Sequence, residues 1–122
     1  MQPDVKSIRP FVGARSYKDS REFYALLGFD EVVIDQGMSL FRLGSFSFYL
    51  QDYYQKQWLN NSMIFLEVAN LDAYHDQLAS LSLPSRYKAC RLSEIKSEDW
   101  GREFFLHDPA GVLWHIGEFT AS

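Results

Sequence analysis

The stretch HDPAGVLWHIGEF, residues 107–119, decides how the rest of the chain is interpreted. The tetrapeptide DPAG at 108–111 is a turn signal, and the run after it alternates as a half-buried strand does. With REFFLH at 102–107 on the other side of the turn, it predicts a β-hairpin. His115 and Glu118 lie on the second strand, so the hairpin belongs to a metal site, to a binding cleft, or to an ordinary strand pair.

The hairpin ends a five-element series in the second half of the chain, residues 62–119. SMIFLEV at 62–68 has strand composition, and Asn70 is a candidate N-cap for a helix. LPSRYKA at 83–89 predicts a short strand, and CRLSEIKSEDWG at 90–101 an irregular stretch. The helix is indicated by apolar side chains at helical spacing, namely Leu71, Tyr74, Leu78 and Leu81.

The same series occurs in residues 7–51. SIRPFVGA at 7–14 predicts a strand, and Ser16 with Asp19 forms the capping pattern of a helix that ends near Gly28. Three strands follow, separated by glycine-containing turns, at 29–35, 38–43 and 45–51. A polar and aromatic connector, residues 52–61, joins the two series. The repeat predicts an internal pseudo-twofold within one domain, residues 1–122.

Alternation within the strands divides their side chains between two faces. One face of each strand is apolar and is expected under the helices: Ile8, Pro10 and Val12; Phe46, Phe48 and Leu50; Ile64, Leu66 and Val68; Val112, Trp114 and Ile116. The other faces mix aromatic and polar groups, as a ligand cleft does. These candidate cleft residues are Arg9, Phe11, Tyr49, Gln51, Met63, Phe65, Glu67 and His115.

The composition of the chain narrows the range of possible functions. The chain has 122 residues, 47% of them hydrophobic and 16% aromatic, with a net charge of −4. No basic patch exists for nucleic acid, and the charge favours a neutral or cationic ligand over an anionic one. The single cysteine, Cys90, allows no intrachain disulfide. No membrane span or secretion signal is predicted, so we expect a cytoplasmic protein.

Two stretches, SREFYALLGF at 20–29 and DPAGVLWHI at 108–116, resemble the vicinal oxygen chelate superfamily. That superfamily includes lactoylglutathione lyases, extradiol dioxygenases, and fosfomycin and bleomycin resistance proteins. The resemblance covers about residues 7–119. It implies an α+β fold of two βαβββ modules, which form a curved mixed sheet around a ligand cleft, with helices on the convex face.

The metalloenzymes of this superfamily carry metal ligands on the first and last strands of each module. By the resemblance, the matching positions here hold Arg9, Tyr49, Met63 and His115. A guanidinium stays protonated, and phenol and thioether are poor ligands for the ions these enzymes use. One imidazole does not make a metal site. We therefore expect neither a metal nor any other cofactor.

Within the superfamily, the chain most resembles the bleomycin resistance proteins. The shared residues are Pro10, Arg15, FY at 23–24, LGF at 27–29, Gly37, Gly44, DWG at 99–101 and DPAG at 108–111. Those proteins are metal-free dimers that sequester a large cationic antibiotic in two interface grooves by aromatic stacking. The resemblance places Trp100 in such a groove. Tyr49 stands where those proteins have a glutamate, and Arg9 adds a positive charge, so bleomycin itself is not the expected ligand.

For three residues the sequence leaves more than one role open. His115 is a metal ligand, a cleft group, or a structural histidine with a polar neighbour. Arg9 binds an anionic ligand group or pairs with Glu67 across the sheet. Trp100 is a stacking surface or the anchor of its loop.

The sequence thus supports three hypotheses. The first is a metal-free protein that sequesters a small, partly aromatic molecule in clefts of a homodimer. The second is an enzyme whose active site has been rebuilt around Arg9, Glu67 and His115. The third is a protein interaction module without a small-molecule ligand.

Overall fold

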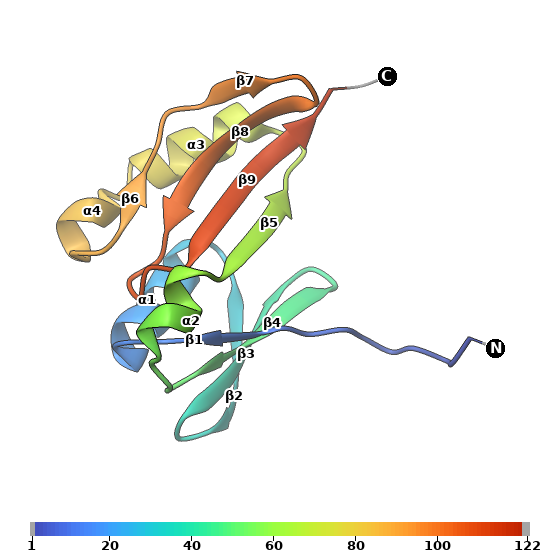
Figure 1. The fold of residues 1–122 in the computed structure, drawn as a ribbon, viewed down its shortest axis with the longest axis vertical. Helices are drawn as coiled ribbons and strands as arrows, with labels where there is room; N and C mark the ends of the chain where they lie inside the picture. Colours follow the sequence, from blue (N-terminus) through green and yellow to red (C-terminus); the bar gives the residue numbers. More distant parts are fainter. Residues whose placement is uncertain (1, 121–122) are drawn as a thin grey trace.

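The first module is a four-stranded sheet with one helix. In the computed structural model, which describes residues 2–120, the strands are ordered β1-β4-β3-β2 (Figure 1). β1 runs parallel to β4, and the other pairs are antiparallel. Its elements are β1 (Phe11–Gly13), α1 (Tyr17–Leu26), β2 (Asp30–Asp35), β3 (Met38–Leu43) and β4 (Phe46–Gln51).

The second module repeats this plan in a separate sheet. Its strands are ordered β5-β9-β8-β6, with β7 also paired to β8. β5 runs parallel to β9, just as β1 does to β4, and α3 lies behind β8 and β9 in Figure 1. Its elements are β5 (Met63–Glu67), α3 (Leu71–Ala79), α4 (Leu83–Arg86), β6 (Arg91–Leu92), β7 (Lys96–Glu98), β8 (Gly101–His107) and β9 (Leu113–Phe119). The matching strand orders confirm the α+β fold of two repeated modules.

The predicted strand at 83–89 is wrong. Residues 83–86 form the short helix α4, because Ser82 adopts a left-handed conformation and Pro84 lies in the first helical turn, where its missing N–H costs nothing. The strands that replace it, β6 and β7, lie within the stretch 90–101 that was expected to be irregular. The connector also contains an unpredicted helix, α2 (Lys56–Asn60), capped by the side chain of Gln55.

The first strand is shorter than expected. Only Phe11–Gly13 pair as β1, while the chain before them extends away from the body of the molecule (Figure 1). Ile8 is 89% exposed, so its expected place under a helix is also wrong.

Helix α1 connects the modules through one hydrophobic cluster. Phe23 and Tyr24 on α1 are fully buried. The Tyr24 ring lies 4.9 Å from Phe48 of the first sheet and 5.7 Å from Trp114 of the second, measured between ring centroids. The capping pattern at Ser16 and the apolar stripe of α1 thus produce the element that joins the two sheets.

Candidate functional site

Three predicted site residues form a cluster on the first sheet. The Arg9 guanidinium donates a 2.9 Å hydrogen bond to the Tyr49 hydroxyl and lies 5.7 Å from the centre of that ring. Phe11 stacks on Tyr49 with ring centroids 5.0 Å apart, because the two residues are paired across β1 and β4. We call Arg9, Phe11 and Tyr49 the first outer cluster. Arg9 therefore has Tyr49 as its partner, rather than the Glu67 that one alternative proposed.

A larger aromatic cluster covers the corresponding surface of the second sheet. Phe65 lies 5.7 Å from Trp100 and 5.7 Å from Phe119, and the last two rings are 5.1 Å apart. His115 lies nearly parallel to Phe65 at 6.4 Å. We call Phe65, Trp100, His115 and Phe119 the second outer cluster. Phe65 and Phe119 are 44% and 54% exposed, so the cluster offers aromatic surface for stacking.

His115 has a protein partner. Its Nδ1 lies 3.0 Å from Oε1 of Glu103, a carboxylate on β8 whose side chain is only 10% exposed. The ring also meets Phe105 edge-on, with centroids 5.0 Å apart. This is the arrangement expected of the structural histidine, and it also fixes the orientation of the imidazole beside Phe65.

Sequence reasoning missed three contributors to this surface. Gly117 and Phe119 follow His115 at every second position of β9, so extending the alternation from Ile116 to residue 119 would have found them. A Cβ atom at Gly117 would lie 2.9 Å from the Phe65 ring and 3.2 Å from Trp100. Gly117 therefore provides the space in which those two rings meet. Glu103 carries no sequence signal, because its role depends on the pairing of β8 with β9.

The remaining predicted residues lie near the clusters. Met63 on β5 is 65% exposed, Glu67 at the end of β5 is exposed, and Gln51 at the end of β4 is half-buried. The contacts described above join residues within each sheet, so the structure gathers the predicted site into two groups rather than one cleft.

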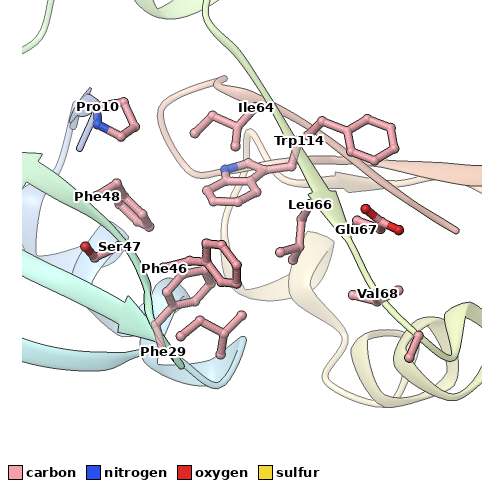
Figure 2. A pocket seen from close by; sticks show the side chains of 13 residues that line it. Pro10, Phe29, Phe46, Ser47, Phe48, Ile64, Leu66, Glu67, Val68 and Trp114 are labelled. Carbon is pink, nitrogen blue, oxygen red and sulfur yellow. The ribbon is translucent and has the colours of Figure 1, made fainter. Parts of the chain in front are cut away.

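A cavity of about 480 Å³ lies between the two sheets (Figure 2). Two predicted site residues, Phe65 and Glu67, border it. Most of its wall comes instead from the apolar strand faces that were expected to lie under helices. This expectation is wrong for Phe46, which is 77% exposed. Its lining residues are Pro10, Phe29, Leu43, Phe46, Ser47, Phe48, Ile64, Phe65, Leu66, Glu67, Val68, Ala69 and Trp114.

A second hollow, of about 520 Å³, has both polar and apolar walls and lies where β5 and β9 end and β8 begins. Arg102 occupies its wall and donates to Asp72 at 2.7 Å and to Glu118 at 2.8 Å. The hydrogen bonds from Arg102 lower the pKa of both carboxyl groups. Glu118 also accepts from the backbone N–H of Leu71 at the start of α3, so this group holds the helix to the sheet.

The residues that the sequence resemblance matched to metal ligands do not fit a metal. Arg9 is hydrogen-bonded to Tyr49, and His115 is hydrogen-bonded to Glu103. Between residues 2 and 120, no three His, Cys, Asp or Glu side chains come close enough together to hold an ion. Within the same range, no helix combines the length and hydrophobicity needed to span a membrane.

Comparisons with solved structures identify similar folds. A bleomycin-binding protein in complex with bleomycin is 19% identical, with a TM-score of 0.78 over 95% of this chain and 100% of its own. A bleomycin-binding protein from Streptomyces verticillus, complexed with copper(II)-bleomycin, is 21% identical, with a TM-score of 0.78 over 98% and 100%. A lactoylglutathione lyase from Agrobacterium tumefaciens is 14% identical, with a TM-score of 0.70 over 94% and 95%. No protein-family model and no curated protein matches the sequence.

Proposed function

Because the chain has the fold of the vicinal oxygen chelate superfamily, we propose that it is a metal-free protein that sequesters a small, partly aromatic molecule. The observation that carries the proposal is the pair of outer clusters, which present partly exposed aromatic rings where the superfamily's metalloenzymes bind metal. Similar structures include proteins described as binding bleomycin and, in one case, as an antibiotic-binding protein. A cytoplasmic location is part of the proposal.

The proposal includes a homodimer that completes the binding clefts. Phe11, Met63, Phe65 and Phe119 are exposed by 44–65% on strand surfaces. Exposed apolar patches of this kind mark interaction sites in soluble proteins. Bringing the first outer cluster of one copy against the second outer cluster of another would place rings on both sides of a ligand.

The ligand would be held by stacking, with the polar groups setting its orientation. Each ring–ring contact contributes roughly 0.5–1.5 kcal/mol beyond area burial. Arg9 and His115 are already oriented by Tyr49 and Glu103, so they offer fixed hydrogen-bonding positions at the edges of the aromatic surface.

A thermal-shift screen of small molecules, followed by turnover assays on each hit, tests the proposal. A binder raises the melting temperature without product formation. Turnover that depends on Arg9, Glu67 and His115 would support the rebuilt enzyme instead. If no compound shifts the melting temperature, the interaction module becomes the better hypothesis.

Trp100→Ala tests the position of the ligand. Affinity for any hit should fall by roughly 1–3 kcal/mol, the range for an aromatic hot spot. Trp58→Ala, which removes a 36%-exposed indole from α2, is the matched control and should bind normally. A folded Trp100→Ala protein with unchanged affinity would move the ligand elsewhere.

Elemental analysis tests the proposal that the protein binds no metal. Protein purified without chelator should contain well under one equivalent of zinc, manganese, iron or nickel. Stoichiometric metal that is lost in His115→Ala would contradict the proposal.

A further inference from the structure

We infer that the cavity between the two sheets is a second binding site, distinct from the outer clusters, and that it takes an uncharged, flat, apolar molecule. The cavity lies largely on the opposite strand faces from the outer clusters, beside Phe48 and Leu66 rather than Tyr49 and Trp100 (Figure 2). Its size of about 480 Å³ falls within the range of ligand pockets.

The floor of the cavity is aromatic and preformed. Phe29, Phe48 and Trp114 meet at mostly edge-to-face angles, with ring centroids 5.4–5.9 Å apart. Tyr24 packs beneath all three rings at 4.9–5.8 Å. All four side chains are less than 8% exposed, so the floor needs little ordering when a ligand arrives.

The walls are apolar, and their side chains differ in how far they are exposed to solvent. On one side lie Ile64 and Leu66 of β5 and Val68 just after it. On the other side lie Leu43 and Phe46 of the β3–β4 hairpin. Phe46 is 77% exposed, although its neighbour Phe48 on the same strand face is buried. A flat ligand between β5 and the hairpin would cover the Phe46 ring and remove this apolar surface from water.

The polar groups of the cavity do not suit a charged ligand. The indole N–H of Trp114 already donates to the Tyr24 hydroxyl at 3.0 Å. Glu67 is the one charged residue among those that line the cavity, and its carboxylate lies on the far side of β5 from Leu66 (Figure 2). A carboxylate placed against the aromatic floor would lose hydration without gaining a partner. An ammonium group would find ring faces that already pack on one another, so uncharged molecules should bind best.

Three matched probes test this inference: anthracenylmethanol, anthracenylmethylamine and anthracenecarboxylate. A protein carrying Trp58→Phe and Trp100→Phe retains Trp114 as its one tryptophan, on the cavity floor. Energy transfer from Trp114 to the anthracene ring then reports binding of the probe, and the two variants below locate the bound probe. The neutral alcohol should bind, and the ammonium and carboxylate forms should each bind about tenfold more weakly or worse.

Two exposed phenylalanines give matched variants. Phe46→Ala should weaken binding of the alcohol about five- to tenfold, because it removes one wall. Phe119→Ala, in the second outer cluster, should leave it unchanged. Both side chains are more than half exposed, so neither change threatens the fold.

The opposite pattern would overturn the inference: tighter binding of a charged probe, or sensitivity to Phe119 and not to Phe46. Binding that appears only after deletion of residues 2–8 would also overturn it, since that segment of a second copy would then fill the cavity. The proposed function is tested separately by Trp100→Ala, a change outside the cavity lining, so the inference and the proposed function fail separately.

Discussion

At the scale of single residues, Tyr24 has the most consequential position in the molecule. Its hydroxyl donates to Asp108 at 2.6 Å and accepts from the indole N–H of Trp114 at 3.0 Å, and all three groups are buried. The sequence predicted that Trp114 is in the core and that DPAG at 108–111 forms a turn. Both are confirmed, since Asp108 accepts from the N–H groups of Ala110 and Val112. The bond to Tyr24 could not be predicted, because it joins residues 84 positions apart.

Tyr24→Phe should destabilise the protein. The change keeps the ring but leaves the Asp108 carboxylate and the Trp114 N–H without their buried partner, at a cost of roughly 1–3 kcal/mol in the free energy of unfolding. Urea denaturation followed by circular dichroism measures this cost. Tyr87→Phe is the control, because the Tyr87 hydroxyl makes a longer, 3.3 Å bond to Glu22. Equal losses in the two variants would contradict the role assigned to Tyr24.

Asp108 should make stability depend on pH. Burial raises the pKa of its carboxyl group to about 6, well above the value of about 3.9 in an unfolded chain. The folded protein therefore holds this proton more tightly. The resulting stability is complete below about pH 4 and is lost as the pH rises through about 6.

Comparison with Asp108→Asn isolates this effect. Between pH 4 and pH 7, the free energy of unfolding of the unmodified protein should fall by about 2–3 kcal/mol relative to the variant. Urea titrations at several pH values supply the comparison. Parallel pH profiles for the two proteins would show that Asp108 titrates alike when folded and unfolded.

At the scale of elements, strand β9 shows what alternation can and cannot predict. The alternation of apolar and polar residues correctly separated Trp114 and Ile116, which are buried, from His115. It did not predict which neighbours His115 would meet, since Phe65 and Glu103 come from β5 and β8. Helix α4 was not predicted, for a different reason. A four-residue helix is too short to show a helical period in the sequence, and Pro84 is compatible with the start of a strand as well as of a helix.

Gly117→Ala tests whether β9 sets the shape of the second outer cluster. The new methyl group would lie 2.9 Å from the Phe65 ring, 3.0 Å from the Arg102 carbonyl oxygen and 3.2 Å from Trp100. The two rings should be displaced, with a shift in tryptophan emission and a loss of roughly 1–3 kcal/mol in stability. Gly37→Ala is the control, because its nearest neighbour would be at an ordinary 3.5 Å. An unchanged emission spectrum in Gly117→Ala would show that the cluster adapts.

At the scale of the whole molecule, the repeated order of elements was enough to predict two modules and their pseudo-twofold. The angle between the sheets was not predictable, because it depends on how α1 packs its rings between them. The inter-sheet cavity follows from that angle, so the sequence assigned most of its strand residues to the helix-covered core and only Phe65 and Glu67 to a cleft. Five members of the outer clusters, Arg9, Phe11, Tyr49, Phe65 and His115, were foreseen because strand parity places them on the non-core faces. Trp100 came from the family resemblance, and Phe119 was missed.

The oligomeric state is the prediction at this scale. Light scattering at tens of micromolar should give twice the 14.2 kDa chain mass, as for a C2 dimer whose apolar strand faces are covered. Phe65→Glu should shift the population toward the monomer, because it places a charge within that surface. A monomer at every concentration would remove the basis for clefts shared between two copies.

The buried cysteine, Cys90, makes unfolding of the chain measurable by chemical labelling. Cys90 is 2% exposed, and burial raises the pKa of its thiol to about 12. Alkylating reagents attack the thiolate, so at neutral pH the folded state is protected both by access and by protonation. Labelling then proceeds only as fast as the core opens. Each molecule thus records in its own mass whether it has unfolded, without any engineered probe.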